Sequence, residues 1–79
     1  MWGGLSRSAL ARKLDCTEGA IRSWERARLL CPTANGRPGV PVEFDSAQVI
    51  RAKAIRFLTG EGALLSEIRE ALGAVGAER

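Results

Sequence analysis

The sequence contains no histidine and no tyrosine, and it has only two cysteines and four aromatic residues among 79 positions. Histidine and cysteine supply most ligands of protein zinc and transition-metal sites, so Cys16 and Cys31 alone leave such a site without enough ligands. A single cysteine pair in a cytoplasmic protein is more typical of free thiols than of a disulfide. We therefore expect no metal and no cofactor.

Catalytic and membrane patterns are missing as well. There is no histidine base, no Ser-Lys or Cys-His arrangement, and no glycine-rich loop that follows a strand. The longest apolar runs are a few residues, far below the roughly 20 residues of a membrane-spanning helix. No basic segment followed by an apolar stretch opens the chain. We expect a cytoplasmic protein that is neither an enzyme nor membrane-bound and has no signal peptide.

The net charge of +3 is unevenly distributed. Residues 7–56 hold ten basic and five acidic side chains, whereas residues 57–79 hold two basic and four acidic ones. A basic front suits a polyanion such as DNA on one side of the domain. The same distribution is also compatible with an ordinary solvated surface, so charge alone leaves both interpretations open.

Two short helices are predicted near the N-terminus. Ser6 is a suitable N-cap for a helix that ends near residue 14, and residues 15–17 form a short break. Thr17 then caps a second helix of about residues 18–28, in which Ile21 and Trp24 lie three apart on one face. Glu18, Arg22, Ser23, Glu25 and Arg26 are left for its outer surface. Two short helices joined by a tight turn are typical of a helix-turn-helix.

A wing, defined here as residues 29–44, is predicted next. Residues 31–39 are rich in turn-forming residues and cannot continue a helix. Residues 40–44 form a short extended piece that contains Pro41, so it would be an edge strand at best. We expect Leu29 and Leu30 to pair with residues 42–44 of this piece.

A third helix is predicted from the spacing of Asp45 and Gln48, which matches a capping box. It runs to about Thr59, with Lys53 and Arg56 on its polar side. Arg51 falls near the apolar side, where it either extends to solvent or bonds a carboxylate. The residues expected to be buried are Ile50, Ala54, Phe57 and Leu58, with Ala52 and Ile55 alongside.

A fourth helix follows the Gly60-Glu61-Gly62 terminator, with Leu65, Ile68 and Leu72 on one face. The expected fold is mostly α: a winged helix-turn-helix with four helices and a short two-stranded wing between helices two and three. We expect one domain over residues 1–79, in which the helix-turn-helix covers 6–28, the wing 29–44, helices three and four 45–73, and a frayed tail 74–79.

Several of these segments resemble a known family. The stretch 21–30, Ile-Arg-Ser-Trp-Glu-Arg-Ala-Arg-Leu-Leu, together with Phe44 to Val49 and Leu65 to Ile68, is similar to the N-terminal DNA-binding domain of MerR-type transcription regulators. The resemblance extends from Leu10 to Leu72 and implies a winged helix-turn-helix that regulates transcription in bacteria or phages. It does not imply sensing of metal, thiol or drug, because the family's dimerisation helix and effector domain lie beyond these residues.

The sequence departs from the family pattern at three places, one of which is Leu64 at the position of the polar cap of helix four. Arg28 stands where the family usually has glycine. In the wing, Glu43 and Phe44 stand where the family usually has an arginine-tyrosine pair, so an acid replaces one expected phosphate contact.

A second resemblance keeps another function open. Leu10-Ala11, the segment 21–24 and the segment 44–50 are also similar to the DNA-binding domain of lambda-type small terminase subunits. Phage excisionases share the Leu5-Ser6 opening and the tryptophan of the second helix. The alternative function is therefore DNA handling in a phage or plasmid. A third hypothesis is a protein-interaction module that has lost DNA binding, which Glu25 and Glu43 favour.

Both resemblances imply docking of the second helix in the major groove of double-stranded DNA. We expect Arg22 to contact a guanine edge or a neighbouring phosphate and Arg26 to contact phosphate. Such a domain neutralises only about four to six phosphates, so we expect it to act through self-association or a larger protein partner. The predicted DNA-binding residues are Thr17, Glu18, Gly19, Arg22, Ser23, Arg26, Asn35, Arg37, Lys53 and Arg56.

Overall fold

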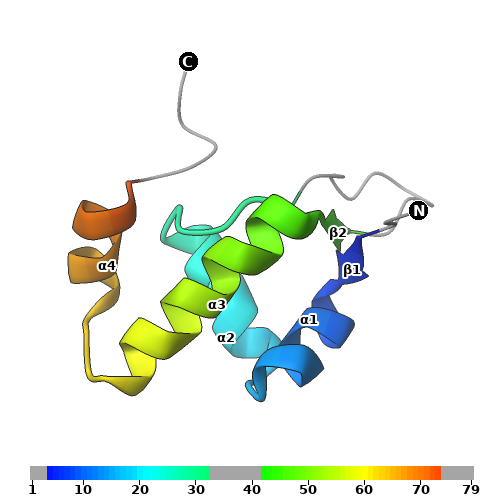
Figure 1. The fold of residues 1–79 in the computed structure, drawn as a ribbon, viewed down its shortest axis with the longest axis horizontal. Helices are drawn as coiled ribbons and strands as arrows, with labels where there is room; N and C mark the ends of the chain where they lie inside the picture. Colours follow the sequence, from blue (N-terminus) through cyan, green and yellow to red (C-terminus); the bar gives the residue numbers. More distant parts are fainter. Residues whose placement is uncertain (1–3, 33–41, 74–79) are drawn as a thin grey trace.

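Four helices and a two-stranded sheet make up the described part of the chain, residues 4–32 and 42–73 of a computed structural model (Figure 1). The mostly helical winged helix-turn-helix architecture is confirmed. The elements in chain order are β1 (Leu5–Ser6), α1 (Arg7–Leu14), α2 (Glu18–Arg26), β2 (Glu43–Phe44), α3 (Ser46–Gly60) and α4 (Leu65–Leu72).

Side-chain N-caps start three of the helices, as the sequence predicts. The hydroxyl of Ser6 accepts a hydrogen bond from Ala9 N at 3.2 Å, and that of Thr17 accepts one from Ala20 N at 3.0 Å. The Asp45 carboxylate accepts the N–H of Gln48 at 3.0 Å. Each cap satisfies a backbone donor that has no partner within its own helix and contributes about 1 kcal/mol.

The end of α2 is set by a left-handed residue. The helix ends at Arg26, two residues before the predicted end, and Arg28 has a φ of 64°. Leu29 N then donates to Trp24 O at 2.9 Å, which closes the turn. A positive φ favours glycine because it has no Cβ. This gives a backbone reason for the glycine that the MerR pattern has at this position.

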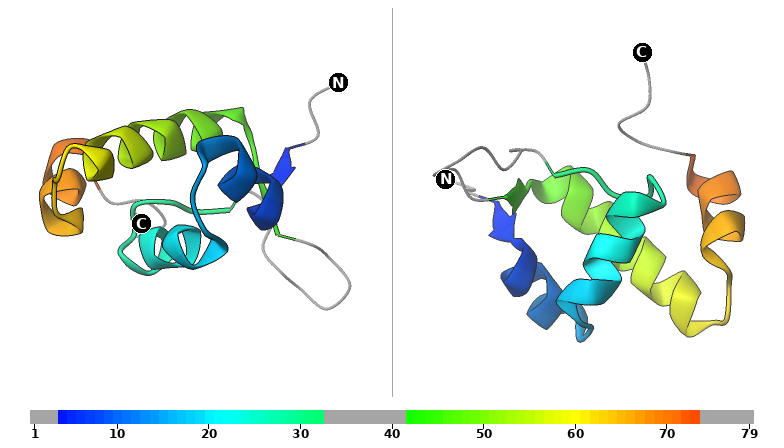
Figure 2. Two further views of the ribbon diagram at one scale, coloured as in Figure 1. Left: turned by 90° about the horizontal axis from the view of Figure 1, so that it is seen from below. Right: turned by 180° about the vertical axis from the view of Figure 1, so that it is seen from behind.

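The core lies between α1, α2 and α3, with Phe44 of β2 closing one end. Figures 1 and 2 show α3 crossing over α2, with α1 beside both and α4 at the far end of α3. Ile21 and Trp24 are buried, as their spacing predicts. The largest fully buried side chains are Leu10, Ile21, Leu29, Phe44, Ile55 and Ile68.

The buried face of α3 differs from the predicted one. Ile50 and Phe57 are 67% and 66% exposed, so the prediction that they are buried was wrong. Ala52 and Ile55 are buried as expected, together with Val49, and Ala54 and Leu58 are half-buried. Apolar residues occur almost all round α3, so their periodicity does not select a face, and packing against α1, α2 and β2 makes the choice.

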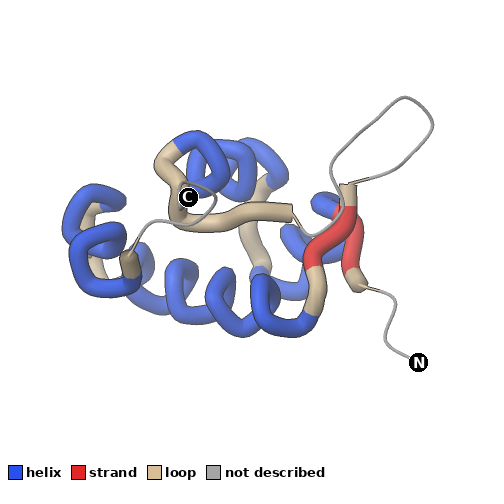
Figure 3. The backbone as a smooth tube through the Cα atoms, turned by 90° about the horizontal axis from the view of Figure 1, so that it is seen from above, coloured by secondary structure: helices blue, strands red, loops and turns tan. Residues whose placement is uncertain are grey.

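The strand pairing also differs from the prediction. β2 pairs with β1 in an antiparallel sheet, with Leu5 opposite Phe44 and Ser6 opposite Glu43 (Figure 3). Leu29 and Leu30 do not form the second strand, because both side chains are buried in the core directly after the left-handed turn. The tip of the predicted wing, residues 33–41, lies outside the described residues, as does the predicted tail 74–79.

Arginines of α3 and α4 bind backbone carbonyls near the ends of other helices. Arg51 donates to the carbonyls of Leu29, Leu72 and Gly73, so neither of its predicted arrangements is correct. Arg69 donates to Ala27 O at 3.2 Å. Such carbonyls have no intrahelical partner and carry partial negative charge. A guanidinium supplies both the missing hydrogen-bond donor and a positive charge. These bonds attach α4 to the end of α2.

The fourth helix forms as predicted, with Ile68 buried against the core. Its first turn is closed by Leu64 N, which donates to the Glu67 carboxylate at 2.8 Å. Within the described segments, none of the helices is long and apolar enough to cross a membrane.

Candidate nucleic-acid interface

The candidate interface is the side of α2 that points away from the core, together with its N-cap. Burial of Ile21 and Trp24 fixes the rotation of the helix and turns the polar positions outward. Ser23 and Glu25 are half-buried, whereas Thr17, Glu18, Gly19, Arg22 and Arg26 are exposed. The structure therefore brings six of the predicted DNA-binding residues onto one surface: Thr17, Glu18, Gly19, Arg22, Ser23 and Arg26.

Arg22 projects from this surface with 54% of its side chain exposed. Its guanidinium lies 3.7 Å from the carboxylate of Glu18, one turn earlier, whose side chain is 45% exposed. An ion pair this long and this exposed contributes little to stability because water screens it. Arg22 is thus held loosely and remains available to an external acceptor.

Arg26 lies one turn beyond Arg22 and donates to the hydroxyl of Ser23 at 3.4 Å. This contact is long and exposed, so it restrains the guanidinium only weakly. Both arginines of α2 therefore present donors to solvent from the same helix.

Gly19 leaves the first turn of α2 without a side chain. A Cβ at this position would contact only the Thr17 hydroxyl, at an ordinary 3.7 Å, and the residue has no positive φ. The fold therefore does not require glycine here, although glycine in a helix costs about 1 kcal/mol relative to alanine. A bare backbone on an exposed helical face permits close approach of a ligand.

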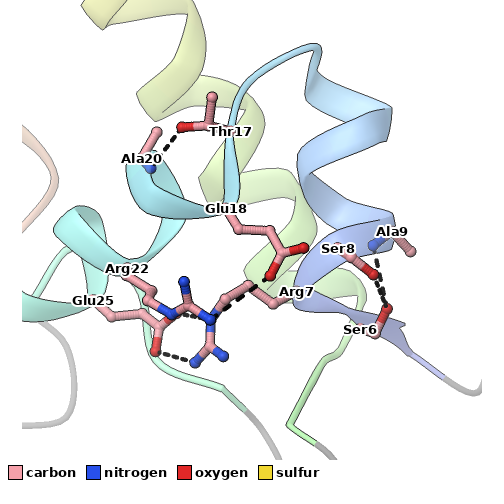
Figure 4. A network of polar contacts seen from close by, with 9 residues as sticks. All are labelled: Ser6, Arg7, Ser8, Ala9, Thr17, Glu18, Ala20, Arg22 and Glu25. Carbon is pink, nitrogen blue, oxygen red and sulfur yellow. Dashed lines mark hydrogen bonds and ion pairs between the residues drawn. The ribbon is translucent and has the colours of Figure 1, made fainter.

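An ion pair between α1 and α2, which the sequence analysis missed, holds this surface in place. Arg7 donates from two nitrogens to the two carboxylate oxygens of Glu25, both at 2.9 Å (Figure 4). The hydrogen bond to Glu25 raises the pKa of the Arg7 guanidinium, against the opposing effect of burial. Bidentate pairs fix orientation as well as distance, so Arg7 helps to fix the position and orientation of α2 relative to α1.

Comparison with protein families agrees with this arrangement. The family described as MerR HTH family regulatory protein matches residues 5–74, which is most of the chain. The chain belongs to the MerR helix-turn-helix family. Neither a curated protein nor a solved structure matches it significantly.

Membership in the MerR family indicates a DNA-binding regulatory protein, and the family is not an enzymatic one. The two acids that favour a module without DNA binding differ in their surroundings. Glu25 is paired with Arg7, so its charge is balanced within the domain. Glu43 lies half-buried in β2, opposite Ser6.

Two of the remaining predicted site residues, Lys53 and Arg56, lie on α3 and not on α2. Lys53 is exposed on α3. Arg56 donates to Leu14 O at 3.1 Å and to Asp15 O at 3.5 Å, where it caps the C-terminus of α1. Asn35 and Arg37 fall outside the described residues.

The described residues contain no group of three or more potential metal ligands from histidine, cysteine, aspartate and glutamate. Cys16 and Cys31 are free thiols. Burial raises the pKa of the Cys16 thiol, while the nearby Arg56 charge lowers it.

Proposed function

We propose that this MerR-family domain binds double-stranded DNA sequence-specifically, with α2 in the major groove, and regulates transcription. The observation that carries the proposal is the exposed side of α2. This side carries Arg22 and Arg26 and no large apolar side chain, and Gly19 leaves its backbone bare. The polar side of one short helix is the surface that helix-turn-helix proteins place against base edges.

The position of each hydrogen-bonding residue on this surface supports a particular role in DNA binding. Arg22 supplies a two-pronged donor for the O6 and N7 atoms of guanine, and Arg26 lies further along the helix, where phosphate is nearer. The hydroxyls of Thr17 and Ser23 supply further polar contacts. Asn35, Arg37 and Lys53 would contribute contacts outside the major groove, mainly to phosphate. Arg56 would contribute only its positive charge, because its guanidinium donates to Leu14 O and Asp15 O.

The first test is an electrophoretic mobility shift assay with a pool of random duplexes at two salt concentrations. The wild-type protein should enrich a defined sequence, and its affinity should fall with rising salt because phosphate contacts release counterions. Arg22→Glu should abolish enrichment. Arg12→Glu, the same charge change at an exposed position on α1, should reduce affinity and keep the selected sequence. An Arg22→Glu protein that selects the same sequence with unchanged affinity would overturn the proposal.

We further propose that regulation uses two copies of the domain on DNA. One domain neutralises about four to six phosphates, which gives modest affinity at physiological salt. Because the DNA of a bacterium or phage is in the cytoplasm, the protein would act there. Sedimentation of the protein with a selected duplex should show two domains per site. A single domain per site would instead favour a larger protein partner.

The location of the selected sites distinguishes the regulator from a phage or plasmid DNA-handling protein. Transcription regulation predicts sites that overlap promoters. Clustered sites at an attachment or packaging locus would show the DNA-handling function instead.

A further inference from the structure

Glu18 is an acidic residue at the centre of the surface proposed to face DNA. Its side chain is 45% exposed and lies beside Arg22, with Gly19 next to it in the chain. A carboxylate repels phosphate, so its presence there weakens sequence-independent binding. Its position in the first turn of α2 favours the helix, since an anion complements the positive N-terminal end. A carboxylate that points away from the DNA would stabilise the start of the helix equally well.

The carboxylate of Glu18 keeps its capacity to accept hydrogen bonds. Its contact with Arg22 is a 3.7 Å ion pair, longer than a hydrogen bond. Arg7 lies close enough for the charge of Glu18 to help raise the pKa of its guanidinium, but Arg7 directs its donors to Glu25. Figure 4 shows these four side chains side by side on α1 and α2.

This arrangement lets Arg22 move away from Glu18 without leaving the negative charge of the carboxylate unbalanced. When Arg22 turns to a base edge, the nearby Arg7 charge still offsets that of Glu18. The carboxylate is then free to accept from a donor on the DNA. In the major groove the donors are exocyclic amino groups, N4 of cytosine and N6 of adenine, whereas guanine and thymine present acceptors to which a carboxylate cannot bond.

We propose that Glu18 determines the base specificity of the domain at the position beside the base contacted by Arg22. It accepts a hydrogen bond from an exocyclic amino group there and repels base edges that offer only acceptors. This inference rests on the proposed function, because it assigns a role within the same DNA-binding surface.

The experiment compares duplexes selected from a random pool by wild-type protein and by Glu18→Gln and Glu18→Ala. Wild-type sites should contain the guanine that depends on Arg22 and, beside it, a position restricted to cytosine or adenine. Glu18→Ala should lose about tenfold or more of the preference at that position. Glu18→Gln should keep adenine but also admit guanine and thymine, because its amide donates as well as accepts. Both variants should keep the guanine that depends on Arg22. Both should also bind random DNA more tightly than wild type at low salt, because one repelling charge is gone.

The matched control is Glu70→Gln, which removes the same charge at an exposed position on α4 and leaves the pair of Arg7 and Glu25 intact. It should keep the wild-type base preferences, and a thermal melt followed by circular dichroism checks that it folds.

The outcomes separate the two proposals. Selection of a guanine that depends on Arg22, with unchanged preferences in Glu18→Ala, overturns the role of Glu18 and leaves the proposed function standing. Failure of the wild-type protein to bind any duplex at low salt removes the proposed function, and the role of Glu18 with it. Preference for cytosine alone or for adenine alone identifies which amino group is read.

Discussion

Helices α2 and α3 both carry two arginines, but they use them in opposite ways. Arg22 and Arg26 of α2 make only long, exposed contacts within their own helix. Arg51 and Arg56 of α3 donate to backbone carbonyls near the ends of α1, α2 and α4. The difference follows from location, because α3 runs past the ends of its neighbours. The guanidinium donors of an arginine in this domain are therefore available to DNA only where they are not already bonded to carbonyls at the end of a helix.

The two helices also differ in how clearly their sequences define a buried face. In α2 the large apolar residues are Ile21 and Trp24, and the rest of the helix is polar or small, so the face is defined. In α3 the apolar residues are spread around the helix, and Ile50 is exposed while its neighbour Val49 is buried. The comparison suggests variants that separate structural from exposed positions within each helix.

The largest expected effect comes from a matched pair of substitutions in α3. Ile55→Ala should lower the free energy of unfolding by about 2–5 kcal/mol, because it leaves a cavity in the core. Ile50→Ala makes the same chemical change on the exposed side and should shift it by no more than about 0.5 kcal/mol. Urea denaturation measures both. Equal losses would show that the exposed face of α3 is packed against something in solution.

The arginines provide the second comparison. Arg22→Ala should weaken binding to a selected duplex by about tenfold or more and leave the free energy of unfolding nearly unchanged. Arg56→Ala removes the same charge but should lower the free energy of unfolding by about 1 kcal/mol, since two carbonyls lose their charged donor. Titration of a labelled duplex and urea denaturation separate the effects. A larger loss of affinity from Arg56→Ala than from Arg22→Ala would reverse the comparison.

Glycines give a third, smaller comparison. Gly19→Ala in α2 should raise the free energy of unfolding by about 0.5–1 kcal/mol, because alanine favours helix and has room. It should weaken DNA binding, since the new methyl group keeps the DNA from the backbone. Gly60→Ala in α3, whose Cβ would meet the flexible end of Arg56 at 3.4 Å, should stabilise without changing affinity. Unchanged affinity in both variants would exclude close approach at Gly19.

The smallest expected effect tests the position of Arg56 near the start of α2. Burial raises the pKa of the Cys16 thiol and Arg56 opposes the shift, so Arg56→Gln should raise that pKa further. Iodoacetamide labelling at pH 8, in a Cys31→Ser background, should then be slower. Because the folded state favours the neutral thiol, this contribution to stability is present at neutral pH and lost as the pH rises through the folded pKa. Faster labelling in the variant would place the guanidinium elsewhere.

Local signals in the sequence predicted the helix starts, because an N-cap depends on residues within one turn of each other. Ser6, Thr17 and Asp45 all act as predicted. The prediction failed where distant residues decide. The pairing of β1 with β2 joins segments about forty residues apart, and the partners Arg7 and Glu25 lie on different helices.

The same division applies to the candidate site. The six site residues within 17–26 share one surface because a single helix and its N-cap carry them, so helical periodicity was sufficient to group them. The use of Arg56 as a cap depends on how α3 crosses the other helices. The sequence of α3 contains no pattern that predicts this crossing.

The pairing of β2 with the start of the chain has a consequence for insertions and deletions. In a hairpin, the number of residues in the connection sets the alignment of the two strands. Here Leu5 fixes the alignment of Phe44 from outside the connection, and Leu30 and Phe44 anchor its two ends in the core. Residues added to or removed from 33–41 would therefore leave the pairing of β1 with β2 unchanged. Related sequences can therefore vary in length at this point at little cost to the fold.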